Sequence, residues 1–141
     1  VTGVQTCALP IYPAACAVAI ANIEIIQREK LVDYVRDDIG PYLQEKWHTL
    51  ADHPLVGETR MVGLMGALEL VKDKSTAERF DKDDGVGTKC RDICVDNGLV
   101  MRAVGDTMVV APPLILTHEQ ADELVEKAWK CLDLTAKAAG L

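Results

Sequence analysis

The chain of 141 residues has few aromatic side chains and few positive charges. Aromatic residues make up 4% of it, and 15 basic residues stand against 22 acidic ones, so that the formal net charge is −7. Binding to nucleic acid or to an anionic membrane surface needs a basic face. This charge balance therefore argues against both partners. A small anionic ligand needs only one well-placed arginine.

The chain also lacks a long apolar run and the spacing of metal ligands. The apolar stretch at residues 12–23 is about half of the roughly 20 residues that span a bilayer, and residues 1–11 do not have the pattern of a signal peptide. The five cysteines form no CxxC pair, and none of the three histidines has a partner at ligand spacing. We therefore expect no membrane partner, no metal, and reduced, buried thiols in a cytoplasmic protein.

The hydrophobic pattern predicts an α+β fold in a chain that is 49% hydrophobic. Helical spacing favours a long helix from Pro13, with a kink or break at Gly40-Pro41, and further helices over 86–96 and from Thr117, where T-x-x-Q forms a capping box. Alternation predicts one strand within 56–71, and a hairpin covers 99–111. These elements predict a three-stranded, mostly antiparallel sheet with helices on one face. We divide the chain into residues 1–11, the long helix 12–48 and a small domain 49–141.

Arg102 is the candidate binding residue that the pattern itself suggests. It ends a predicted short apolar strand at the mouth of the hairpin, where a guanidinium can present a planar fork to a carboxylate. The alternative is an ion pair with Asp106 across the hairpin. None of the nine lysines has the apolar neighbours that a catalytic amine requires.

Three segments resemble class III pyridoxal-phosphate aminotransferases, and within them the omega-amino acid and putrescine–pyruvate group. They are PAACAVAIANIEIIQREKL (13–31), VGLMGALELV (62–71) and GLVMRAVGDTMVVAPPLILTHEQADELV (98–125). The third is the most specific, because it joins a strand, an arginine, a Gly-Asp turn and a double proline in a fixed order. The resemblance covers residues 12–134, which would be about the last third of a family member.

The resemblance implies a fold type I enzyme that uses pyridoxal 5'-phosphate and works as a homodimer. Such an enzyme moves an amino group from an amine donor or omega-amino acid to pyruvate or a related keto-acid acceptor. This chain would be the small C-terminal domain and the helix leading into it. Arg102 matches the arginine of the family's R-x-x-G-D context, which binds the substrate carboxylate. The family's Schiff-base lysine and its cofactor-binding residues lie upstream, so the resemblance implies a fragment that is inactive alone.

A departure from the family pattern and the residues missing upstream leave alternatives open. Members often have T-Y-S-G-H-P before the long helix, whereas residues 8–13 match it only at Pro13. We interpret residues 1–11 as a segment outside the family, an artefact of a truncated gene. The alternative function is a stand-alone α+β module that binds a small ligand or regulates a partner without catalysis. Another class III subgroup, acting on ornithine derivatives or 4-aminobutyrate, also fits, because the residues that select the donor lie mostly upstream.

Overall fold

The computed structural model describes residues 13–141, so the segment 1–11 that the sequence sets apart lies outside the described residues. The chain divides into two compact units, Val1–Val32 and Asp33–Leu141, and each is described by itself. No helix within residues 13–141 is long and apolar enough to cross a membrane.

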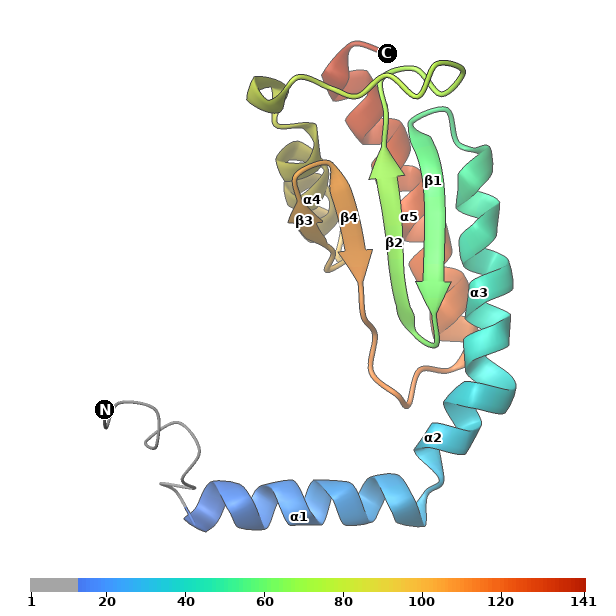
Figure 1. Ribbon diagram of the computed structural model, residues 1–141, viewed down its shortest axis with the longest axis vertical. Coiled ribbons are helices and arrows are strands. Elements are labelled where there is room, and N and C mark those ends of the chain that lie inside the picture. Colours follow the sequence, from blue (N-terminus) through green and yellow to red (C-terminus); the bar gives the residue numbers. More distant parts are fainter. Residues whose placement is uncertain (1–12) are drawn as a thin grey trace, which may run out of the picture. The chain divides into compact units, whose positions relative to one another are not determined.

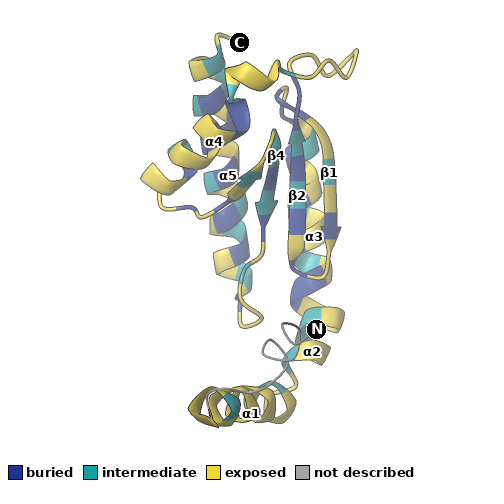
Figure 2. Ribbon diagram, turned by 60° about the vertical axis from the view of Figure 1, so that its left-hand side comes forward, coloured by how far each residue is buried: buried dark blue, intermediate teal, exposed yellow. Residues whose placement is uncertain are grey.

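The first unit contains helix α1 (Pro13–Arg28). It begins at the predicted proline, which suits the first turn of a helix because its missing N–H is not needed there. None of its residues is buried (Figure 2). Val18 and Ile20 are 70% and 59% exposed. The predicted long helix is wrong beyond Arg28. Lys30 takes a left-handed conformation with φ of 52°, which ends the helical hydrogen-bond ladder.

The helical path resumes as α2 (Leu31–Tyr34), a π-helical turn (Val35–Ile39) and α3 (Gly40–His48). The kink or break predicted at Gly40-Pro41 is instead a widened turn, in which the Gly40 N–H donates to the Val35 carbonyl. A Cβ atom on Gly40 would lie 2.2 Å from that carbonyl oxygen, so only glycine fits the turn. Pro41 then falls in the first turn of α3, where it lacks no needed donor. Because α3 packs into the core, the second unit includes it.

The sheet has four antiparallel strands, not the predicted three (Figure 1). The strands are β1 (Val56–Val62), β2 (Met65–Leu70), β3 (Arg102–Val104) and β4 (Thr107–Val110), in the spatial order β1-β2-β4-β3. The single strand predicted within 56–71 is a hairpin. Gly63, with φ of +57°, turns the chain between the two arms. In the sequence, apolar residues alternate through this turn at Val62, Leu64, Leu68 and Leu70, so the turn does not interrupt the pattern.

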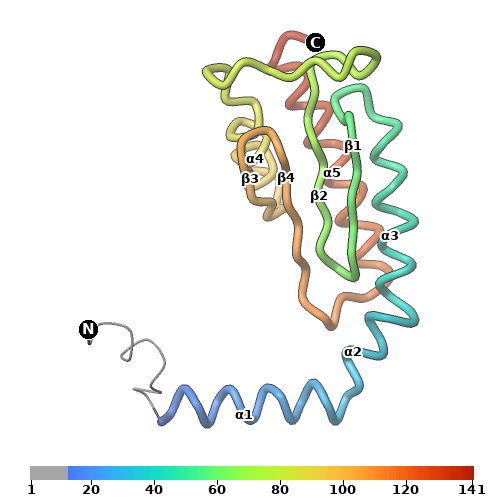
Figure 3. Tube along the Cα trace, in the orientation of Figure 1, coloured from blue at the N-terminus to red at the C-terminus, as the bar shows by residue number. Residues whose placement is uncertain are grey.

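Helices α3, α4 (Val86–Asp96) and α5 (His118–Ala139) lie on one face of this sheet (Figures 1 and 3). The predicted capping box of α5 is confirmed: the Thr117 side chain accepts from the Gln120 N–H, and the Gln120 side chain accepts from the Thr117 N–H. The core between helices and sheet is closely packed. Its largest fully buried side chains include Trp47, Ile39, Leu43, Leu68, Leu70, Met108 and Leu132. No helix of the second unit covers the other face of the sheet, which we call the open face.

Candidate functional site

One row of residues crosses the open face from edge to edge. The strand registers pair Arg60 with Ala67, Ala67 with Val109, and Val109 with Arg102. Paired residues of an antiparallel sheet point to the same side, and their neighbours along each strand point to the other. Leu68, which follows Ala67, is fully buried under the helices. The row therefore faces away from the helices, with one arginine at each end.

The middle of the row is apolar and is in contact with the core. Ala67 and Val109 are half-buried, and the indole N–H of Trp47 donates to the Ala67 carbonyl at 3.3 Å from the covered side. A shallow hollow of about 140 Å³ lies beside them. It is lined by Arg60, Met61, Val62, Met65, Gly66, Ala67 and Val109.

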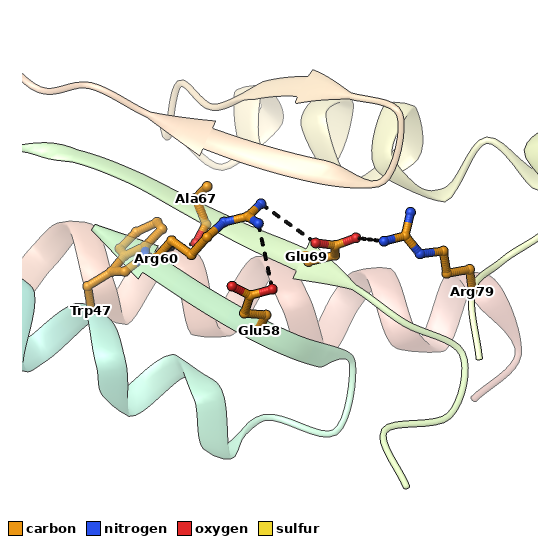
Figure 4. A network of polar contacts seen from close by, with 6 residues as sticks. All are labelled: Trp47, Glu58, Arg60, Ala67, Glu69 and Arg79. Atoms are coloured by element: carbon orange, nitrogen blue, oxygen red, sulfur yellow. Dashed lines mark hydrogen bonds and ion pairs between the residues drawn. The ribbon is translucent and has the colours of Figure 1, made fainter. Parts of the chain in front are cut away.

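Arg60, at one end of the row, belongs to a network of ion pairs (Figure 4). Its guanidinium lies 3.6 Å from Glu58 and 3.6 Å from Glu69. Glu69 also pairs with Arg79, and its side chain is only 17% exposed. Two arginines and two glutamates thus neutralise one another on this part of the open face.

Arg102, at the other end, has no such partner. Its side chain makes no ion pair or hydrogen bond with any residue in 13–141, whereas each of the other five arginines pairs with a carboxylate. The alternative pairing with Asp106 is not formed; that carboxylate instead accepts a hydrogen bond from the Gly87 N–H at 3.0 Å. Arg102 therefore presents an exposed cation without a counter-charge among the described residues.

The position of Arg102 in the hairpin differs from the prediction. The strand begins at Arg102 and does not end there, and the hairpin turn has only two residues, Gly105 and Asp106. Arg102 stands about 7 Å along the strand from the residue that enters the turn, at a rise of about 3.3 Å per residue. It is therefore placed at the start of a short edge strand, away from the turn.

The lysines do not fit the attachment of an aldehyde cofactor. None of the nine is buried. Hydrogen bonding and charge attraction from Asp122 raise the pKa of Lys46, and those from Glu78 raise the pKa of Lys72. A lysine that forms a Schiff base needs the opposite shift, from burial or a neighbouring cation. The residues described here therefore do not supply the bond to pyridoxal phosphate.

Sequence reasoning missed one buried polar group, His53, which is 2% exposed. Its Nδ1 accepts from the Leu55 N–H at 3.1 Å, and its Nε2 lies 3.2 Å from a carboxylate oxygen of Asp133. The backbone donor fixes the tautomer, so that Nε2 carries the proton. In the sequence, His53 stands in Asp-His-Pro (52–54), which is typical of a turn and does not indicate burial. The contact between His53 and Asp133 links the start of β1 to α5.

The predicted burial of thiols is confirmed for Cys90, Cys94 and Cys131. Cys90 and Cys94 share one face of α4, as their spacing predicts, and Cys131 faces them from α5 in the same core cluster. Burial raises the pKa of the Cys131 thiol. A buried thiol with a raised pKa is a poor nucleophile, which applies to Cys131. A hydrogen bond with Cys94 lowers the pKa of Cys90, but that thiol is as deeply buried in the same core cluster, so its place is in the packing of the core.

Comparison with known proteins places this geometry in a family. Residues 12–132 match the family model of class III aminotransferases. A putrescine–pyruvate aminotransferase of Pseudomonas aeruginosa is 57% identical over 127 residues, which are 90% of this chain and 28% of that protein. A mitochondrial gamma-aminobutyrate transaminase of Solanum lycopersicum is 37% identical, over 89% of this chain and 24% of that protein.

Solved structures agree with the sequence relatives. An omega-transferase from Vibrio fluvialis superposes with a TM-score of 0.84 at 38% identity, over 92% of this chain and 31% of that one. A pyridoxamine-phosphate-bound aminotransferase from the same species gives a TM-score of 0.82, also at 38% identity, over 89% of this chain and 27% of that one. The fold is thus that of a part of a fold type I transaminase, and the chain spans less than a third of the length of these relatives. By its sequence match and its fold, this chain belongs to the class III aminotransferase family, whose members depend on pyridoxal phosphate.

Proposed function

We propose that these residues form the C-terminal part of an aminotransferase that moves an amino group from an amine or omega-amino acid to pyruvate or a related keto acid. The relative at 57% identity is a putrescine–pyruvate aminotransferase, which supports this choice of donor and acceptor. Pyridoxal phosphate supplies the carrier of the amino group. The cofactor and the lysine that holds it belong to the remainder of the enzyme, so the chain of 141 residues is inactive alone.

The role of this part is to bind the carboxylate of the substrate through Arg102. The observation that carries the proposal is that Arg102 alone among the six arginines has no carboxylate partner within residues 13–141. An exposed guanidinium can form two parallel hydrogen bonds to a carboxylate, which fixes both its position and its orientation. Holding the substrate in one orientation is how a residue that does no chemistry contributes to rate.

The test is the substitution Arg102→Gln in the longer enzyme that contains these residues. In a ping-pong reaction, kcat/KM is measured separately for each substrate. For β-alanine and for pyruvate, which carry a carboxylate, we expect kcat/KM to fall about 10- to 100-fold, the effect of losing hydrogen bonds to a charged group. For putrescine, which has no carboxylate, kcat/KM should remain within about twofold of the parent.

Arg91→Gln is the matched control. Arg91 lies on α4 and pairs with Asp92, so its loss removes one positive charge away from the open face. It should leave all three values unchanged. An equal fall for putrescine and β-alanine in Arg102→Gln would contradict the proposed role. The isolated chain of 141 residues, assayed with added pyridoxal phosphate, should show no transfer.

We further propose that the enzyme is a cytoplasmic homodimer, as the family resemblance implies. The four cysteines of the described residues are free, which supports a reducing compartment. The exposed apolar side chains of α1 support a larger assembly, since helices that are apolar all round are usually covered. Sedimentation equilibrium of the longer enzyme measures its mass, and a monomer at micromolar concentration would contradict this assignment.

A further inference from the structure

We infer that Asp106 is a positioning residue, which holds the β3–β4 hairpin against α4 and thereby fixes where Arg102 stands. This inference rests on the proposed function of Arg102. Asp106 is four residues from Arg102 in sequence and does not contact its side chain. Its effect on substrate binding would pass entirely through the backbone of the hairpin.

The strand that carries Arg102 has little support of its own. β3 has three residues, lies at the edge of the sheet and pairs only with β4. Arg102 is its first residue, so the chain leaves the sheet immediately before it. Short edge strands open locally at low cost, because few hydrogen bonds and contacts must be broken. The position of Arg102 therefore depends on what holds the rest of the hairpin.

The hairpin turn is held on one side by the N-terminus of α4. The Asp106 carboxylate accepts the Gly87 N–H at 3.0 Å, and Gly87 is the second residue of that helix. The first N–H groups of a helix have no partner within it, and a negative charge there is also favoured by the helix dipole. A charged acceptor makes this hydrogen bond stronger than one between neutral groups.

Gly87 permits the contact because it has no side chain. A Cβ atom at this position would lie 2.0 Å from the Gly105 carbonyl oxygen and 3.0 Å from the Cα atom of Asp106. Both obstacles are backbone atoms, which cannot rotate away. The hairpin turn can therefore contact the helix only when residue 87 is glycine. Within the turn, Gly105 adopts φ of +59°, which a two-residue turn of this kind requires.

The same turn is held on its other side by β2. The carbonyl of Asp106 accepts the N–H of Leu70 at 2.9 Å, and Leu70 is fully buried in the core. The backbone of Asp106 thus fastens the turn to β2, while its carboxylate fastens it to α4. A two-residue turn transmits this placement directly to Val104, and from there through two residues of regular strand to Arg102.

The test is Asp106→Ala in the longer enzyme, with kcat/KM measured for putrescine, β-alanine and pyruvate. If Asp106 positions Arg102, the values for β-alanine and pyruvate fall at least about fivefold and the value for putrescine stays within about twofold. For Asp106→Asn, kcat/KM for β-alanine and pyruvate should lie between the values of Asp106→Ala and the parent. The amide oxygen of asparagine still accepts a hydrogen bond but carries no charge. Hydrogen exchange at residues 102–104 should accelerate in both variants in the same order.

A merely structural role gives a different result. Loss of thermal stability with equal changes in all three kcat/KM values, or unchanged exchange at residues 102–104, would overturn the inference. If Asp106→Ala does not fold, Gly87→Ala disrupts the same contact on the α4 side. It should likewise lower kcat/KM for β-alanine and pyruvate but not for putrescine. The variant Arg102→Gln separates the two proposals: when it is selective and Asp106→Ala is not, only this inference fails. When Arg102→Gln is not selective, the proposed function fails.

Discussion

Gly66→Ala tests whether the sheet is tightly packed against the core. Gly66 lies in β2, and a Cβ atom there would lie 2.5 Å from the Met61 methyl carbon, 3.0 Å from a ring carbon of Trp47 and 3.1 Å from a methyl of Val110. Trp47 is fully buried and its indole N–H is bonded to Ala67, so the ring has little room to move. Met61 is the neighbour that can yield.

The expected cost follows from forcing one methyl group into a packed core, which is about 1–3 kcal/mol of unfolding free energy. With a urea m-value of about 2 kcal/mol per M, the unfolding midpoint falls by about 0.5–1.5 M. The assay is urea unfolding of the chain, followed by the fluorescence of its tryptophans. The slope should be unchanged, because the substitution alters packing and not the surface exposed on unfolding.

A double-mutant cycle with Met61→Ala identifies the clash. Met61→Ala alone leaves a cavity and costs about 2 kcal/mol or more. In the double variant the added methyl occupies part of that cavity, so the combined loss should be smaller than the sum of the two single losses by at least about 0.5 kcal/mol. Additive losses, or a midpoint for Gly66→Ala within about 0.2 M of the parent, would refute the packing argument.

Two further predictions concern reactivity and pH. Cys16 is half-buried and should react with iodoacetamide in the native chain, whereas Cys131, buried and with a raised pKa, should react only on unfolding, as mapped by mass spectrometry. A hydrogen bond and charge attraction from Lys46 lower the pKa of Asp122, so its contribution to stability is present above the unfolded carboxyl value of about 3.9 and is lost as pH falls through the lowered folded value. Asp122→Asn should therefore lower Tm at pH 7, and calorimetry should show the difference starting to shrink below about pH 4 and vanishing once the pH is below the lowered folded pKa.

The parts of the fold that the sequence predicts correctly are those set by local chemistry. The capping box at Thr117 and apolar residues spaced three or four apart predict the helix that follows, and both features are present in α5. The helix over 86–96 ends at Asn97-Gly98, where Gly98 adopts φ of +72°. Each of these signals acts within a few residues, so the local sequence is enough to predict where the helix begins or ends.

The errors arise where the cause lies outside the local pattern. In the sequence, the apolar residues Val62, Leu64, Leu68 and Leu70 alternate through Gly63, so periodicity alone predicts one strand. The turn reverses the faces, and Val62 lies 84% exposed on the open face. The predicted break at Gly40-Pro41 is avoided because a π-helical turn places the glycine against Val35. The end of α1 at Lys30 follows from a left-handed residue that is neither glycine nor asparagine, which no propensity predicts.

The candidate site shows the same division between local and distant causes. Residue type and context single out Arg102, but Arg60 is an equally long cation in the same row of the open face. The two differ because Glu69 lies one strand from Arg60 and neutralises it, whereas the acid nearest to Arg102 in sequence, Asp106, is bonded to a helix that begins 20 residues earlier in the chain. A free guanidinium gains the whole attraction of an incoming carboxylate, while one that is already paired must first give up its partner. The contact that holds the hairpin against α4 therefore also engages the carboxylate that the sequence alone would pair with Arg102.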